Sequence, residues 1–355
     1  MKTDNFNHYT GRAISPAEAA TRQMAAALGG ERIRTLDEAV RTQDSSLSYQ
    51  VNQLEDFDQT LHKPLSDVTW GRDIDLRPGL KMTAELASFT RSIMGTTGTQ
   101  SVGGKPWFNP KSNTIPGVSI NGEKVARPVR LLAREVAWNE IELERSQDLG
   151  QPLDMAQMEA LNMSYQMDTD ACVYIGDAEM GFKGLVNNDA VVTTADVGNG
   201  AWATETDPDK FLGDVNEILV TAWERAAYAV CPSDLLLPPL KFARLVALKV
   251  SSAGNISILN YIKENCISAA INGRPLNIRP LKWCNAAART TAAAPVTKDR
   301  MVAYTKDVGR VRFPLVPIRR FTSYVQGLRY ATPYAWAYGE MEFLYPETVL
   351  YRDNI

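Results

Sequence analysis

The stretch from Asp168 to Asn187, with the sequence DTDACVYIGDAEMGFKGLVN, decides the fold because it contains the end of a long helix. Pro152 suits the first position of that helix, and Gly176 can adopt the left-handed conformation in which many helices end. Side chains of one helix face recur every three or four residues, at Met158, Leu161, Tyr165, Thr169 and Cys172. This spacing predicts a helix over about residues 152–175, roughly 36 Å long, with a single stripe that would lie across a sheet.

The sequence before this helix has the pattern of a long β-hairpin. Strand-like stretches at about Leu80–Ile93 and Val118–Leu132 flank an irregular, glycine-rich centre with aromatic residues. An isolated two-stranded hairpin is marginally stable in water, so we expect it to lie on a partner. The tip residues that we expect to make assembly contacts are Gly95, Gly98, Gly103, Lys105, Trp107 and Phe108.

The first 72 residues or so are polar and contain only short helical patterns. One of these places Leu47, Val51, Leu54 and Phe57 on one helix face. Nothing in this region amounts to an independent core, so we predict an extended arm that buries its apolar residues on neighbouring molecules.

The sequence after the long helix alternates helices and short strands. Asp207-Pro208 is a strong helix start, and the pattern continues to about Ala229. A short buried strand at 235–239, helices at about Leu240–Val250 and Ile258–Ser268, and a strand at Leu276–Cys284 complete a compact α/β unit. An Ala/Thr-rich linker over 286–295 leads to short strands from Met301 onward.

Composition excludes several classes of protein. The chain has 355 residues, 45% hydrophobic and 22% charged, as in an ordinary globular protein. A net charge of −3 excludes a strongly cationic nucleic-acid binder at the level of the whole chain. The four cysteines are scattered, so we expect reduced, buried thiols in a protein made in a cytoplasm. We find no signal peptide pattern and no apolar run long enough to cross a bilayer.

Catalytic and cofactor motifs are missing from the sequence. The two histidines, His8 and His62, lie in the arm, and Pro106 replaces the hydroxyl residue that a phosphate-binding loop needs after Lys105. Asp168 and Asp170 resemble the start of a calcium loop, but a solvated helix face is the simpler interpretation. We therefore expect no catalytic residue, no cofactor and no metal, and an enzyme with dispersed acids is the weaker alternative.

Five arginines gather near the end of the chain, at Arg310, Arg312, Arg319, Arg320 and Arg329. They could make salt bridges to other subunits or lie near DNA. Alternate strand positions point to opposite faces, so the five need not form one patch. We favour subunit contacts.

The order of these elements resembles the Hong Kong 97-type capsid fold, which tailed-phage coat proteins and encapsulin shells share. In that family the long helix ends at a glycine and a Gly-Leu-x-Asn turn follows, as Gly176 and then Gly184, Leu185 and Asn187 do here. The stretch 329–353, with its closing Tyr-x-Asp, is similar to the final strands of one phage coat subgroup. The stretch 301–307 is similar to the strand that re-enters the peripheral domain.

The resemblance implies an α+β fold with four parts. These are an N-terminal arm (1–72), an extended β-hairpin loop (73–132), a peripheral domain (133–205 and 286–355) with a spine helix at about 152–175, and an axial α/β domain (206–285). The long N-terminal scaffolding region that many members lose to a protease is not expected here, because the arm is short and broken.

The resemblance also implies a function without catalysis. The subunit would assemble with itself into the hexamers and pentamers of an icosahedral capsid around a phage double-stranded DNA genome. Portal, scaffold and decoration proteins are expected as further partners, the DNA would be held without sequence-specific binding, and no membrane is involved. Assembly in the host cytoplasm and residence in the virion capsid follow. An encapsulin-type shell is the alternative, which the arm of about 75 residues disfavours.

Overall fold

A computed structural model describes residues 6–7, 12–13, 66–97, 117–148, 153–194, 196, 202–250, 254–289 and 298–355. The chain divides into two compact units, Met1–His62 and Lys63–Ile355. In the first unit, β1 (Phe6–Asn7) and β2 (Arg12–Ala13) form an antiparallel pair. All the features described below belong to the second unit.

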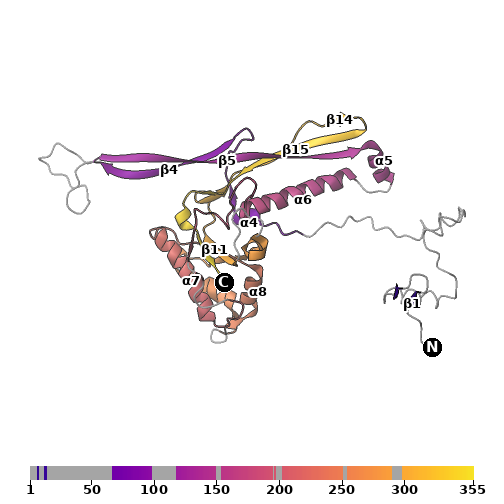
Figure 1. Cartoon of the computed structure of the whole chain (residues 1–355). Helices are drawn as coiled ribbons and strands as arrows, with labels where there is room; N and C mark the ends of the chain where they lie inside the picture. Colours follow the sequence, from indigo (N-terminus) through magenta and orange to yellow (C-terminus); the bar gives the residue numbers. More distant parts are fainter. Residues whose placement is uncertain are drawn as a thin grey trace, which may run out of the picture. The chain divides into compact units, whose positions relative to one another are not determined.

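A long β-ribbon projects from the body of this unit (Figure 1). It consists of β4 (Leu86–Thr97) and β5 (Gly117–Asn139), which pair antiparallel along the whole of β4. The far half of β5 pairs with β15 (Arg329–Gly339), and β15 also pairs with β13 (Leu315–Arg320) and β14 (Tyr324–Gln326). The strand β4 begins six residues after the predicted Leu80 and ends four residues after the predicted Ile93. The strand β5 extends beyond both of its predicted bounds and runs without a break through the predicted domain boundary at 132/133.

A long helix lies along this sheet (Figure 1). The short helix α5 (Glu140–Asp148) precedes α6 (Leu153–Tyr174), whose bounds agree closely with the helix predicted at 152–175. The predicted stripe is the buried one, since Leu161 packs with Val136 of β5 and Tyr165 meets Trp336 of β15 edge-on at a centroid distance of 5.4 Å.

A five-stranded sheet separates two hydrophobic cores. Its strand order is β10 (Asn277–Pro280), β7 (Asp234–Leu237), β11 (Arg300–Tyr304), β17 (Leu350–Asp353) and β6 (Val192–Thr194). Because successive strand residues point to opposite faces, Val302 and Tyr304 join the core beneath α6. Met301 and Ala303 join the second core, on the other face.

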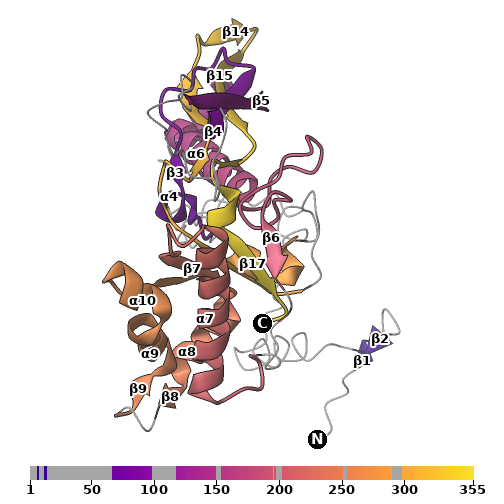
Figure 2. The same cartoon turned by 90° about the vertical axis from the view of Figure 1, so that its left-hand side faces the viewer.

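Four helices cover the second core (Figure 2). They are α7 (Pro208–Arg225), α8 (Pro239–Ala247), α9 (Ile258–Asn265) and α10 (Ile267–Asn272), with a small ladder of β8 (Lys249–Val250) and β9 (Ile256–Ser257). Asp207 caps α7 as predicted. The single helix predicted over 258–268 is wrong, because Cys266 is extended and the Asn216 side chain accepts a hydrogen bond from Ile267 N, which starts α10.

Several of the remaining elements pair the first residues of the unit with strands near its C-terminal end. The helix α4 (Trp70–Asp73) is followed by β3 (Asp75–Leu76), which pairs with β12 (Val311–Phe313), and β12 pairs with β16 (Glu342–Phe343). The 3-10 helices are η2 (Lys282–Cys284), η3 (Ala286–Arg289) and η4 (Pro346–Thr348). η3 replaces the first part of the predicted linker.

The structure corrects the expectation that Asp170 lies on a solvated helix face. Its side chain is fully buried and accepts hydrogen bonds from the backbone N–H groups of Thr69 (2.8 Å) and Trp70 (3.0 Å). It also accepts from Trp283 Nε1 at 2.7 Å. Asp170 therefore anchors the start of α4 to α6.

Candidate functional site

The outer half of the ribbon exposes large apolar side chains. Met94 lies directly opposite Ile120, and Val118 lies opposite the next position on the same side of β4. Their exposed fractions are 75%, 68% and 73%. Side chains at alternate positions of paired strands share a face, so these three form one patch, here called the distal apolar face. No core formed by the described residues covers it.

The predicted tip contacts fall in two groups. Gly95 lies in β4 opposite Ser119, whose hydroxyl donates to Gly95 O at 3.3 Å. A Cβ at Gly95 would lie 3.3 Å from that hydroxyl, so the position is tight. Gly98, Gly103, Lys105, Trp107 and Phe108 lie outside the described residues.

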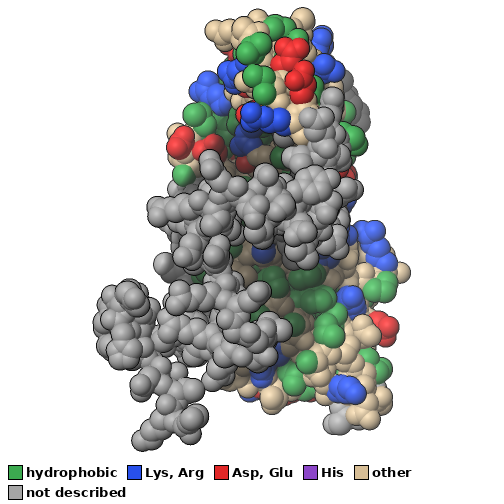
Figure 3. Space-filling model, turned by 90° about the vertical axis from the view of Figure 1, so that its right-hand side faces the viewer, with side chains coloured by type: hydrophobic (Ala, Val, Ile, Leu, Met, Phe, Trp, Pro, Cys, Tyr) green, Lys and Arg blue, Asp and Glu red, His purple; other side chains and the backbone are tan. Residues whose placement is uncertain are grey.

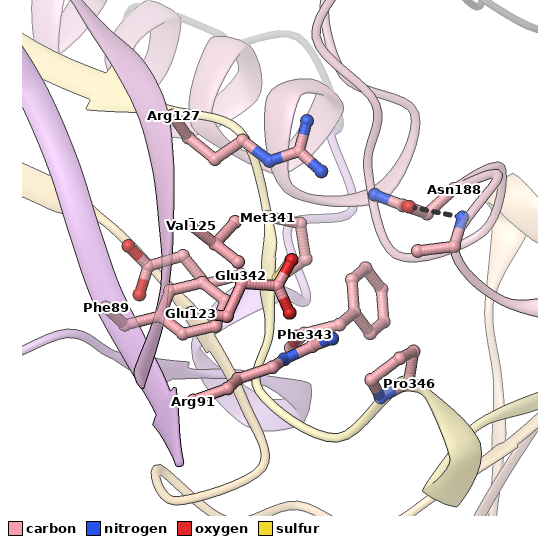
Figure 4. A pocket seen from close by; sticks show the side chains of 11 residues that line it. Phe89, Arg91, Glu123, Val125, Arg127, Asn188, Met341, Glu342, Phe343 and Pro346 are labelled. Carbon is pink, nitrogen blue, oxygen red and sulfur yellow. Dashed lines mark hydrogen bonds between the residues drawn. The ribbon is translucent and has the colours of Figure 1, made fainter. Parts of the chain in front are cut away.

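A hollow of about 280 Å³ opens where the ribbon joins the body (Figure 4). On the ribbon side Phe89, Arg91 and Glu123 face Met341 and Phe343 of the body. Arg91 donates from Nη2 to Phe343 O at 2.9 Å and so ties the base of the ribbon to the body. The side chains of the ribbon change here from packed to exposed.

Two acids near this hollow, Glu342 and Glu340, are paired with arginines. Glu342 is buried and accepts from Arg77 Nη1 (2.5 Å) and Arg312 Nε (2.7 Å). Glu340 lies 2.9 Å from Arg127 Nη1, and burial raises the pKa of the Glu340 carboxyl. Both carboxylates have structural partners, so their burial needs no catalytic explanation.

The glycine turn after α6 is built by close backbone contacts. Gly176 has φ +74°, and a Cβ there would lie 2.0 Å from Phe182 O. A Cβ at Gly184 would lie 2.3 Å from Tyr174 O. Asn187 accepts from Gly184 N and donates to Ile175 O, each at 2.8 Å, and the adjacent Leu185 is fully buried. These residues therefore close the end of α6 against the next segment.

A buried charge cluster at Asp73 was not predicted from the sequence. The Asp73 carboxylate accepts from Arg72 Nε and Nη2 (both 2.8 Å), from Arg279 Nη1 (2.8 Å) and from the Tyr174 hydroxyl (2.7 Å). The Tyr304 hydroxyl donates to the backbone oxygen of Asp73 at 2.8 Å. Burial acts to raise the pKa of Asp73, but these donors outweigh it and hold the pKa below its ordinary value. Because Tyr174, Arg279 and Tyr304 each lie more than 100 residues from Asp73 in the sequence, no local pattern marks the cluster.

Among the described residues, no group of three or more His, Cys, Asp or Glu side chains could hold a metal ion. The four cysteines are free and buried, and burial raises the pKa of the Cys284 thiol to about 12. The two histidines lie outside the described residues. No helix in the described part of the chain is long and apolar enough to cross a membrane.

The arginines near the end of the chain make contacts within the unit. Arg312 pairs with Glu342, Arg329 pairs with Glu135, and Arg310 lies 3.6 Å from Asp307. The other two contact Phe321 and Ser323, respectively. Around the end that carries α5 and β14, basic, acidic and hydrophobic side chains are intermingled (Figure 3).

Comparisons with solved structures show what this fold is similar to. The capsid of Myoviridae phage XM1 aligns with a TM-score of 0.68 at 14% identity, covering 86% of this chain and 98% of that one. The capsid of a native GTA particle gives 0.54 at 11% identity, covering 88% and 99%. Gordonia phage Cozz gives 0.51 at 13% identity, covering 86% and 93%. At these identities the likeness shows the fold, an α+β arrangement similar to phage capsids.

The family comparison covers more than half of the chain. No curated protein matches the sequence significantly. The family model described as major capsid protein, however, matches residues 104–355. That span includes β5, the glycine turn after α6, the whole of the second core and all of the first core except Ile74. The chain therefore belongs to the major capsid protein family and is a structural subunit of a capsid.

Proposed function

We propose that this capsid subunit assembles into the hexamers and pentamers of an icosahedral shell around the double-stranded DNA of a tailed phage. The distal apolar face carries the argument. Met94, Val118 and Ile120 are each about 70% exposed, on a ribbon that is only two strands wide. A monomer gains nothing from such a surface, whereas a closed assembly buries it on every neighbour.

The parts of the unit fit the division into a peripheral and an axial domain. In this proposal α6 is the spine helix, and the core beneath it belongs to the peripheral domain (133–205 and 286–355). The core covered by α7 to α10 is formed mainly by the axial domain (206–285), with Met301 and Ala303 of β11 added from the peripheral domain. The two cores share one sheet, which supports a firm connection between the domains. The ribbon is then the extended loop (73–132), and residues 1–72 are the arm.

The proposed role is structural and includes no catalytic step. The net charge of −3 suits a container that holds DNA without gripping it. Portal, scaffold and decoration proteins remain proposed partners, and assembly in the host cytoplasm remains a proposal. The encapsulin alternative is the less supported of the two.

The experiment is a charge placed on the distal apolar face. Ile120→Glu should leave the subunit soluble and folded, because Ile120 is 68% exposed, and should abolish closed particles in negative-stain microscopy. Ile120→Val is the matched control and should assemble normally. Normal particles from Ile120→Glu would contradict the role proposed for the ribbon.

A further inference from the structure

A second hollow, of about 300 Å³, opens where the ends of α7 and α10 meet the end of β11. The lining residues that matter here are Trp223, Tyr228, Ile271, Arg274, Thr305 and Arg310. The volume is about ten times the ~30 Å³ that one water molecule occupies in the liquid. None of the features described above uses this hollow.

The aromatic wall is held in an unfavourable backbone conformation. Ala227 and Tyr228 both have positive φ (50° and 62°), which side-chain-bearing residues rarely adopt. The Trp223 and Tyr228 rings meet edge-on at a centroid distance of 4.9 Å, and Trp223 Nε1 donates to Tyr228 O at 2.9 Å. Strain of this kind persists where the surroundings fix it, and it is concentrated at binding sites.

Two of the side chains that line the hollow, Thr305 and Arg274, have no polar or ionic partner among the described residues. Thr305 is only 5% exposed, and its hydroxyl has no hydrogen-bond partner among the described residues. Arg274 makes no ion pair within the described residues, and Arg310 is only 3.6 Å from the half-exposed Asp307. The described residues that line the hollow include no acidic residue. Two guanidinium groups and a buried hydroxyl, beside an aromatic wall, fit a carboxylate next to an apolar side chain.

The arm contains a segment of that composition. Between Arg41 and Lys63 there is no lysine or arginine, and four acids are present, Asp44, Glu55, Asp56 and Asp58. Phe57 lies between two of them, so an aromatic ring is flanked by carboxylates on both sides. The charges of this segment and of the hollow are complementary.

We propose that residues 55–58 of a second copy dock in this hollow, with Phe57 against Trp223 and with Asp56 and Asp58 on Arg274 and Arg310. This inference rests on the proposed function, since it needs copies held side by side in a shell. It adds the site at which the arm is received.

Peptide binding tests the hollow directly. A fluorescent peptide of residues 42–62 is titrated onto the full chain carrying Asp56→Lys and Asp58→Lys, whose own arm cannot compete. We expect saturable binding that weakens roughly tenfold or more with Arg274→Glu and Arg310→Glu. Arg225→Glu, an exposed cation of α7 outside the hollow, is the matched control and should change binding less than twofold. Phe57→Ala in the peptide should also weaken binding. Equal binding by all variants, or displacement of the peptide by a DNA oligonucleotide, would overturn the proposal.

Charge exchange tests the same contact in the shell. Reversing the arm (Asp56→Lys, Asp58→Lys) or the hollow (Arg274→Asp, Arg310→Asp) should lower the yield of particles, and combining both reversals should restore it. Mixing the two singly reversed chains should also restore particles if the contact joins different copies; no recovery would refute docking between copies. If wild type assembles and both reversals assemble equally well, this inference fails and the proposed function stands. If wild type forms no particles with its virion partners, the proposed function itself fails.

Discussion

Asp73→Asn is the substitution that most sharply tests how the segment at the start of the unit is held against α6 and β10. The Asp73 side chain is fully buried and accepts four hydrogen bonds, three of them from guanidinium groups. Asparagine keeps the shape and one acceptor oxygen but removes the charge. Arg72 and Arg279 then face each other across a neutral amide.

The magnitude follows from the exposure of the two arginines. Removing one partner of a fully buried ion pair costs about 3–5 kcal/mol. Here the side chains of Arg72 and Arg279 are 39% and 21% exposed, so water compensates part of the loss. We expect a loss of about 3 kcal/mol, and with a urea slope of about 3 kcal/mol per molar the midpoint should fall by roughly 1 M.

The assay is urea unfolding of the unassembled subunit, followed by tryptophan fluorescence at fixed protein concentration. Because the folded-state pKa of Asp73 lies below its unfolded value of 3.8, its charge stabilises the fold above about pH 4. That stabilisation is lost as pH falls through the folded pKa, so wild type and variant should converge in acid. Asp75→Asn, at a partly exposed pair with Lys306, is the control and should cost less than about 1 kcal/mol. A loss below 1 kcal/mol for Asp73→Asn, or one independent of pH, would refute this reasoning.

Three further predictions concern stability and covalent state. Gly184→Ala should lower the free energy of unfolding by more than about 3 kcal/mol in thermal or urea unfolding, because its Cβ would clash with the Tyr174 backbone. Gly213→Ala is the control: it lies in the middle of α7 with free space around its Cα, and should raise the free energy of unfolding by about 0.5–1 kcal/mol. Arg289→Met should leave stability unchanged or raise it, since Arg289 is fully buried and two of its nitrogens have no partner among the described residues; a clear loss in urea unfolding would show that its charge is compensated. Mature shells should not be covalently crosslinked, because residues 301–353 contain no asparagine with which a hairpin lysine could form a crosslink. Boiling in detergent should therefore give one band near 39.3 kDa and not a ladder.

Elements whose signals are local could be predicted from the sequence. The α6 helix differs from its predicted bounds by only one residue at each end. Its start, its buried stripe and the glycine at which it ends are all signals within the segment itself. The start of α7 at Asp207-Pro208 is likewise a local signal. The hairpin was predicted, but its second strand was predicted too short, since pairing with β15 extends β5 to Asn139.

Features made by distant contacts could not be predicted. The break at Cys266 depends on a cap from Asn216 in another helix, 51 residues away from Ile267. Asp170 reads as a surface acid until Trp283, 113 residues later, is placed against it. The hollow beside Trp223 joins residues from three elements, and none of them carries a motif. The tip residues from Gly98 to Phe108 stay a prediction.

The central claim is that this chain builds closed shells through surfaces that a single copy leaves exposed. The most direct measurement is analytical ultracentrifugation of the purified full chain over a range of micromolar concentrations, alone and with its virion partners, with negative-stain microscopy of the sedimenting species. We expect pentamers, hexamers or closed shells whose abundance rises with concentration. A single monomeric species at every concentration, with and without those partners, would contradict the claim.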